Sequence, residues 1–132
     1  MDVEYAAEVT PDECRREDAH ESGERDRIGL HGLAHITGGG LTDNIPRVLP
    51  EGLEAVLERR RWGVDPVFDW LQRTAHIDAA EMYRTFNCGL GMVVIVPAAH
   101  AAAAAELLAA HGESAHIVGE VRSGGRGVVI QE

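Results

Sequence analysis

A histidine, three successive glycines and an arginine lie close together in this chain and could act on an anionic ligand. His35 precedes Gly38, Gly39 and Gly40, and Arg47 follows them. Three glycines offer no side chain to pack, and they suit a turn with positive φ or a close approach of a ligand to the main chain. The next residues, 42–44 (Thr-Asp-Asn), are types that favour helix starts. The stretch therefore predicts a glycine turn that runs into a helix N-terminus, where N–H groups could bind a phosphate.

The side chains around this turn have chemical and structural alternatives, and the sequence leaves both open. His35 could be a general acid or base near neutral pH, or a buried histidine hydrogen-bonded to the backbone. Arg47 could pair with a phosphate or be a surface arginine, and Asn44 could bind a sugar or cap a turn. The glycines themselves could form a plain flexible turn.

A second glycine-rich corner spans residues 85–91, directly before the most hydrophobic run of the chain, residues 92–96. Thr85 and Asn87 could hydrogen-bond a sugar or an amide there, and Gly89 tolerates an unusual backbone conformation, but all three could equally serve turn formation. Cys88 would be nucleophilic only beside a positive charge that lowers its pKa; next to a hydrophobic strand, inert packing is the commoner role. Loops at strand ends often bind ligands, so the two corners together form the candidate site.

The elements that must position these corners predict an α+β fold, with helices packed on the faces of a mixed β-sheet. The run at 92–96 is β-branched and does not alternate, which predicts a central strand covered on both faces. Further strands are expected at residues 28–37, 115–122 and 127–130, the last two as a hairpin. Asp65-Pro66 and Asp78 predict helix starts, and residues 98–111 predict an alanine-rich helix that stops at Gly112.

The helix after Asp65 carries an apolar stripe that predicts a core-facing position. The stripe consists of Val67, Phe68, Leu71 and Ala75, with Trp70 at its edge. Such spacing places the side chains on one face of a helix, and that face normally packs on the core of the domain.

Composition limits the classes of protein that this chain can belong to. It has 132 residues, 45% of them hydrophobic, which is enough for one modest domain. The net charge of −10 argues against nucleic acid or an anionic membrane as a partner. The chain has no lysine, which excludes a lysine nucleophile or a P-loop, and its two cysteines show no metal-binding spacing. We therefore predict no metal site, no membrane segment and a cytoplasmic location.

Charge also divides the chain in two. Residues 1–27 hold ten acidic and four basic side chains, and between Asp12 and Arg27 they contain almost no large apolar residue. We expect residues 1–27 to be an acidic, disordered leader and residues 28–132 to be the folded domain.

Two long stretches resemble a known family. They read L-A-H-I-T-G-G-G-L followed by N-I-P-R-V-L-P at residues 33–41 and 44–50, and E-M-Y-R-T-F-N-C-G-L-G-M at residues 81–92. Both resemble the C-terminal domain of phosphoribosylformylglycinamidine cyclo-ligase, also called aminoimidazole ribonucleotide synthetase, an enzyme of purine biosynthesis. The resemblance begins near Leu30 and does not cover residues 1–27. It also favours a strand over residues 53–62, where the local spacing of apolar residues would fit a helix.

The resemblance implies a reaction and a set of residues. Members of the family use ATP and magnesium to close the imidazole ring of formylglycinamidine ribonucleotide, in a cleft between two domains. By resemblance, His35 is the candidate catalytic residue. The substrate-binding residues that the resemblance implies line the walls of that cleft; they are Thr37, Gly38, Gly39, Gly40, Thr85, Asn87 and Gly89. Asn44 and Arg47 join them as candidate substrate-binding residues because of their own chemistry.

The family also has an N-terminal domain, which carries the acidic metal ligands and most ATP contacts, and nothing in residues 1–27 resembles it. ATP and magnesium are therefore implied for the family but not predicted for this chain alone. Three possibilities stay open: a truncated cyclo-ligase, one subunit of a split enzyme that meets a separate N-terminal domain, or a non-catalytic domain that binds a sugar phosphate. The sheet is expected to be incomplete, and the chain alone is expected not to catalyse the reaction.

Overall fold

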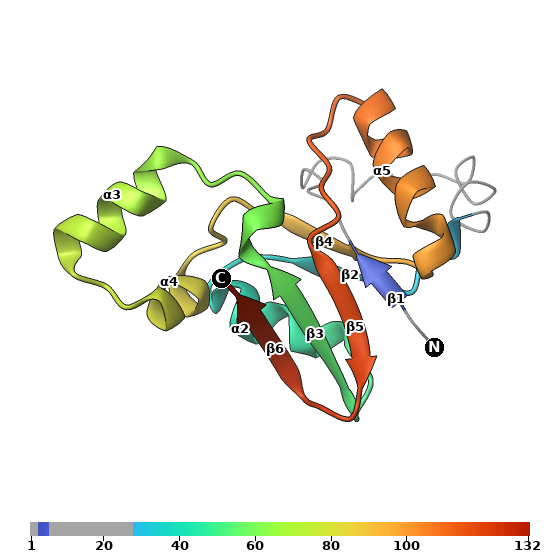
Figure 1. Ribbon diagram of the computed structural model, residues 1–132, viewed down its shortest axis with the longest axis horizontal. Coiled ribbons are helices and arrows are strands. Elements are labelled where there is room, and N and C mark those ends of the chain that lie inside the picture. Colours follow the sequence, from blue (N-terminus) through green and yellow to red (C-terminus); the bar gives the residue numbers. More distant parts are fainter. Residues whose placement is uncertain (1–2, 6–27) are drawn as a thin grey trace.

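A computed structural model describes residues 3–5 and 28–132 of the chain. Within these residues a single six-stranded sheet forms the centre of the fold (Figure 1). Its strands are β1 (Val3–Tyr5), β2 (Gly32–His35), β3 (Leu53–Glu58), β4 (Met92–Ile95), β5 (Gly119–Ser123) and β6 (Gly127–Gln131). The helices are α2 (Gly40–Asn44), α3 (Pro66–Ala75), α4 (Ala79–Thr85) and α5 (Ala101–Ala110), with 3₁₀ helices η1 (Ile45–Val48), η2 (Arg59–Arg61) and η3 (Ala98–His100).

The strands follow the order β2-β4-β1-β5-β3-β6. All neighbours are antiparallel except β3 and β6, which are parallel, so the sheet is mixed as predicted. β4 is the predicted central strand, and all four of its residues are buried. β3 confirms the strand that the resemblance favours over residues 53–62.

The predicted hairpin between the last two strands is wrong. β5 and β6 are consecutive in the chain, yet β3 lies between them and pairs with both. The connection instead passes the beginning of β3, where the amide of Gly124 donates to the carbonyl oxygen of Gly52 at 2.9 Å. Gly124 and Gly127 both have positive φ, which lets the chain turn sharply enough to skip one strand position.

Part of the predicted leader joins the sheet. β1 lies between β4 and β5, with Val3 opposite Val121 and Tyr5 opposite both Gly119 and Ile95. For residues 3–5 the expectation of a disordered leader is therefore not met, because their backbone completes the ladder between two other strands. Residues 1–2 and 6–27 lie outside the described part of the chain, so the domain boundary at residue 28 stays a prediction.

Two apolar clusters lie on opposite faces of the sheet. The first joins β2, β3 and β4 to α2 and η1, and its largest fully buried members are Leu41, Ile45, Leu57 and Leu90. The second packs α5 on the other face of β4, around Met92, Val94 and Val96. Along β2, Ala34 belongs to the first cluster and Leu33 packs on the second, as expected for alternating side chains. Helices thus cover both faces, which confirms the α+β architecture.

The predicted helix starts at Asp65 and Asp78 are confirmed by α3 and α4, and Gly112 follows the end of α5 with φ +89°. The core-facing position predicted for α3 is wrong. None of its residues is buried, and Figure 1 shows the helix standing away from the sheet at the end of the molecule opposite α5. No helix among the described residues has the length and hydropathy needed to cross a bilayer.

Candidate functional site

The glycine turn at residues 38–40 connects β2 to α2, but the helix begins differently from the prediction. α2 starts at Gly40, with Gly39 in the left-handed conformation at the capping position and no side chain capping it. Residues 42–44 lie inside the helix instead of preceding it. The amide of Gly40 is already bonded to the carbonyl oxygen of Thr37 at 2.9 Å, and α2 is only five residues long. An anion site based on a helix N-terminus is therefore not formed here.

At two of the three positions the fold itself requires glycine. Gly40 has φ +56°, and a Cβ there would lie 2.1 Å from the carbonyl oxygen of Tyr83 and 2.7 Å from that of Phe86. Gly39 has φ +102°, and its Cβ would lie 2.9 Å from the Cβ of Asp43. Both positions exclude other residues because of backbone conformation and contact with neighbours.

Gly38 is different from its two neighbours. It is exposed, its φ is not positive, and a Cβ at this position would have no heavy atom within 4 Å. Nothing within the fold therefore requires glycine at position 38. Close approach of a ligand to the main chain is one physical reason to keep a side chain away from such a position.

Asn44 holds the turn from the inside. It is the buried polar residue of the described chain, at 5% exposure. Its side-chain nitrogen donates to the carbonyl oxygens of Thr37, Gly38 and Gly40 at 3.2, 3.3 and 2.8 Å. Its side-chain oxygen accepts from the Thr37 hydroxyl at 3.5 Å and from Arg47 Nη1 at 3.3 Å. Because its polar atoms all have partners within the turn, Asn44 positions Thr37 and Arg47 around Gly38.

His35 lies at the end of β2 and is exposed. Its neighbours Ala34 and Ile36 are buried in the cluster under α2, so strand alternation directs His35 to the opposite face of the sheet. Among the described residues, no hydrogen bond joins His35 to Asn44 or Arg47. The structure thus brings Thr37, the glycines, Asn44 and Arg47 together and directs the His35 side chain to the other face of the sheet.

The second corner lies beside the first. Gly40 approaches the backbone of Tyr83 and Phe86 at the end of α4, and the amide of Ile36 donates to the carbonyl oxygen of Gly91 at 2.9 Å. The two corners that were paired from sequence are thus adjacent in the fold. Two residues of the second corner differ in exposure. Thr85 is exposed and its hydroxyl donates to Glu81 at 3.1 Å, whereas Asn87 is half-buried and accepts from the amide of Gly89 at 3.0 Å.

Gly89 also has a structural role. Its φ is +96°, and a Cβ there would lie 2.9 Å from the carbonyl oxygen of Gly63. Asn87 and Gly89 therefore both take part in forming the turn, which is the structural alternative to binding a ligand. Of the three residues Thr85, Asn87 and Gly89, Thr85 has a side chain that is open to solvent.

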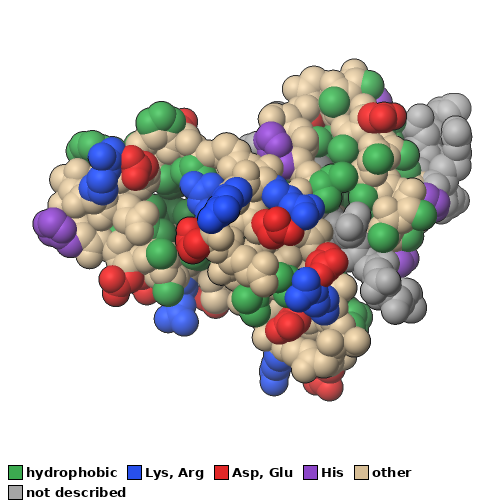
Figure 2. Space-filling view, viewed as in Figure 1, with side chains coloured by type: hydrophobic (Ala, Val, Ile, Leu, Met, Phe, Trp, Pro, Cys, Tyr) green, Lys and Arg blue, Asp and Glu red, His purple; other side chains and the backbone are tan. Residues whose placement is uncertain are grey.

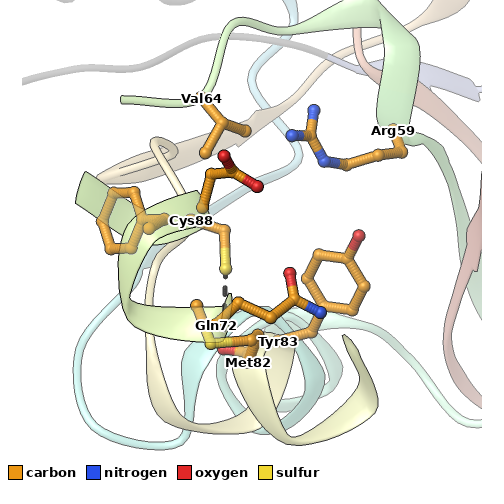
Figure 3. Close-up of a pocket in the computed structure, with 8 residues that line it drawn as sticks. Arg59, Val64, Gln72, Met82, Tyr83 and Cys88 are labelled. Carbon is orange, nitrogen blue, oxygen red and sulfur yellow. Dashed lines mark hydrogen bonds between the residues drawn. The ribbon is translucent and has the colours of Figure 1, made fainter. Parts of the chain in front are cut away.

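A pocket that the sequence did not indicate lies between α3, α4 and the segment after β3. Its volume is about 220 Å³, and its walls include Arg59, Gln72, Met82, Tyr83 and Cys88 (Figure 3). The walls come from segments up to 29 positions apart, from Arg59 to Cys88, so no local pattern marks them in the sequence.

Cys88 in this pocket carries a buried thiol. It is 3% exposed, and its sulfur points to the carbonyl oxygen of Met82 at 3.5 Å (Figure 3). Burial raises the pKa of the Cys88 thiol, and the nearby Arg59 guanidinium opposes this shift without overcoming it. A raised pKa keeps the thiol protonated at neutral pH, as inert packing requires.

Tyr83 and Arg59 are held by contacts of their own. Burial raises the pKa of Tyr83 to about 12, helped by the hydrogen bond of its hydroxyl to Glu132 at 3.1 Å. The Arg59 guanidinium lies 5.2 Å from the centre of the Trp62 ring and donates to the Trp62 carbonyl oxygen. Trp62 in turn is buried and donates from its ring nitrogen to the carbonyl oxygen of Cys88 at 3.0 Å.

The open face of β3 and β5 carries paired charges. Glu54 lies opposite Arg122 in the ladder, and Arg122 also pairs with Glu120. Figure 2 shows acidic and basic side chains interspersed over this part of the surface. Among residues 3–5 and 28–132, no group of three or more His, Cys, Asp or Glu side chains is arranged to hold a metal ion.

Comparison with known proteins places the chain in a family. Residues 7–132 match the family described as AIR synthase related protein, C-terminal domain. The matched range includes most of residues 1–27, the segment that we predict to be an acidic leader. Two phosphoribosylformylglycinamidine cyclo-ligases, from Methylobacillus flagellatus and Paraburkholderia phymatum, are each 55% identical to the chain over 100 and 101 residues. These matches cover 76% of this chain but only 29% and 28% of the two relatives.

The fold is also found in solved structures. A chain of the HypE–HypF complex superposes with a TM-score of 0.64 at 18% identity, covering 98% of this chain and 49% of that chain. At this identity the likeness concerns the fold alone. The chain belongs to the family of AIR synthase related proteins and carries their C-terminal domain.

Proposed function

We propose that this chain supplies the C-terminal domain of an ATP-dependent phosphoribosylformylglycinamidine cyclo-ligase, a cytoplasmic enzyme of purine biosynthesis that forms aminoimidazole ribonucleotide. The names of the two 55% identical relatives support the reaction. The geometric observation that carries the proposal is the glycine turn: Asn44 holds it internally, while Thr37, Gly38 and Arg47 stay exposed on its outer side.

The exposed groups of the turn suit the phosphate of a ribonucleotide. Arg47 takes part in none of the ion pairs among the described residues, so its charge is available to an anion. Gly38 lets a ligand reach the main chain, and the Thr37 hydroxyl adds a further hydrogen-bonding group. Thr85 on the neighbouring corner extends the same wall. In this proposal Asn44, Gly39, Gly40, Asn87 and Gly89 shape the wall without touching the substrate.

His35 is the candidate catalytic residue in this proposal. Its side chain is exposed at the end of β2, two residues before Thr37. An imidazole there could move a proton to or from the substrate near neutral pH.

ATP and magnesium do not fit the described residues on their own, because these residues lack a group of ligands that could hold a metal ion. We therefore assign MgATP binding to the polypeptide that precedes this domain in the relatives, which are about three times longer than the matched region. When bound, MgATP would supply the phosphoryl group that activates the formyl oxygen.

A non-catalytic domain that binds a sugar phosphate is the second candidate. The observation that favours it is the position of His35: the exposed groups of the turn lie together, whereas strand alternation directs His35 to the opposite face of the sheet. One subunit of a split enzyme is the remaining possibility.

Turnover of formylglycinamidine ribonucleotide with MgATP distinguishes these possibilities. The purified chain is assayed alone and together with the N-terminal region of the Methylobacillus flagellatus enzyme, made as a separate polypeptide. Activity only in the mixture supports the proposal. If neither sample turns over but the chain binds the ribonucleotide in calorimetry, the chain is a sugar-phosphate-binding domain. Activity of the chain alone would contradict our assignment of MgATP to another polypeptide.

A further inference from the structure

α3 is an amphipathic helix, and part of its apolar face is open to solvent in the described fold. Val67 is 45% exposed and Trp70 is 58% exposed, and no residue of the helix is buried. In Figure 2, hydrophobic side chains are visible at the surface over this part of the molecule. Large apolar side chains gathered in one place on a surface mark an interaction site more often than scattered ones do.

The two sides of α3 have different surroundings. Phe68 packs against Phe86 with ring centres 6.1 Å apart, and Phe68 and Gln72, one helical turn apart, line the pocket toward α4. Val67, Trp70 and Leu71 follow the spacing i, i+3, i+4, so they share one side of the helix, and none of them lines that pocket. Val67 and Trp70 are exposed and Leu71 is half-buried. We call these three residues the α3 face. Asp69 and Arg73 form an ion pair at 2.5 Å on the polar side of the helix.

A helix in this position needs a further contact to be stable. α3 has ten residues, and isolated helices of that length are marginal in water. The helix is capped by Asp65, which accepts from the amide of Val67 at 2.9 Å, but a cap orders only the first turn. Packing of the apolar face is the usual source of helix stability in a folded protein.

We propose that the α3 face is the docking surface for the polypeptide that precedes this domain in the cyclo-ligases, and this proposal rests on the function proposed above. The family domain is a C-terminal one, and about 70% of the length of each of the two 55% identical relatives lies outside the matched region. A second copy of this chain is disfavoured as the occupant, because it would bring together two chains of net charge −10. The same charge disfavours nucleic acid.

The experiment compares the solvent access of Trp70 in two proteins. One is the full chain alone. The other is a chimaera in which residues 28–132 replace the matched region of the Methylobacillus flagellatus enzyme. Trp62 is 4% exposed and contributes a constant background, so the difference between each protein and its Trp70→Phe variant isolates the fluorescence of Trp70. Iodide quenching of that difference signal measures access to the side chain.

We expect Trp70 to be quenched by iodide in the chain alone and to be protected in the chimaera, with a shift of its emission to shorter wavelength. Trp70→Ala should lower the thermal midpoint of the chimaera. Val129→Ala removes an exposed apolar side chain from β6, outside the α3 face, and should leave that midpoint unchanged. Equal quenching of Trp70 in the two proteins would overturn the proposal, as would protection of Trp70 already in the chain alone.

Activity of the chimaera separates this proposal from the proposed function. If the chimaera protects Trp70 but does not turn over formylglycinamidine ribonucleotide, docking stands and the assignment of the reaction fails. If it turns over the substrate while Trp70 stays accessible, the reaction stands and the docking surface is wrong.

Discussion

The side-chain nitrogen of Asn44 lies 2.8 Å from the carbonyl oxygen of Gly40. The same nitrogen reaches the carbonyl oxygens of Thr37 and Gly38, so one buried amide fixes both sides of the glycine turn. Both polar atoms of the Asn44 side chain thus have hydrogen-bond partners within the fold, while substrate binding by Asn44 stays a prediction. The candidate site depends on Asn44, because Arg47 and the Thr37 hydroxyl both donate hydrogen bonds to its side-chain oxygen.

Asn44→Ala should therefore destabilise the domain. The substitution removes the side-chain donor from the buried carbonyl oxygen of Gly40, a change that costs about 2 kcal/mol. Urea unfolding followed by circular dichroism measures the loss. Asp43→Ala, at the exposed position next to it, is the matched control and should change the unfolding free energy by less than about 0.5 kcal/mol. Equal effects of the two substitutions would show that the amide does not hold the turn.

The three glycines should respond differently to alanine. Gly40→Ala places a Cβ 2.1 Å from the carbonyl oxygen of Tyr83 at a left-handed position, and we expect a loss of at least about 2 kcal/mol in unfolding free energy. Gly38→Ala meets no neighbouring atom, so stability should be unchanged while affinity for the ribonucleotide falls. Unfolding curves and calorimetric titrations of both variants test this separation. A Gly38→Ala variant with unaltered affinity would remove position 38 from the substrate wall.

His35→Ala should lower turnover in the assembled enzyme without affecting stability, because the side chain is exposed. Loss of a general acid or base lowers kcat by about 10² or more, whereas loss of a substrate contact chiefly raises KM. Steady-state kinetics of the chain mixed with the N-terminal region of the relative decides between the two roles. If both kcat and KM are unchanged, His35 has neither role.

Stability should fall at alkaline pH because of Tyr83. Its pKa is raised from 10.0 to about 12 in the folded state, so the folded protein holds the phenol proton more tightly than the unfolded chain does. The resulting contribution is fully present below pH 10 and is lost as the pH rises from 10 to about 12. Tyr83→Phe should make the unfolding free energy less dependent on pH in this window. The measurement is urea unfolding at several pH values, and parallel slopes for the two proteins would contradict the prediction.

The Asp65 cap should contribute to the local stability of α3. Asp65→Ala removes the hydrogen bond to the amide of Val67 and should cost about 1 kcal/mol of local helix stability. Hydrogen exchange of the α3 amides should therefore become several times faster. Asp78 is the matched control, because it precedes α4 without forming a side-chain capping bond. Asp78→Ala should leave the exchange of α4 nearly unchanged, and a comparable acceleration there would mean that the two aspartates act alike.

Local sequence patterns determined much of this protein. The Asp-Pro pair at residues 65–66 starts α3, the β-branched run at 92–96 gives the buried strand β4, and glycine stops α5. Two glycine-rich corners could be paired as one site because each adjoins a strand. These features depend on capping, φ preference and hydrophobic run length, which act over a few residues and can therefore be read from the chain directly.

Tertiary structure decided the rest. β3 separates β5 from β6, and β1 enters between β4 and β5, because strand pairing joins residues that are distant in sequence. Asn44 is a positioning residue because the turn closes around it, and α3 is exposed although its spacing is that of a core-facing helix. Periodicity shows that a helix has an apolar face but not what covers that face, since the covering surface belongs to another part of the fold or to another polypeptide.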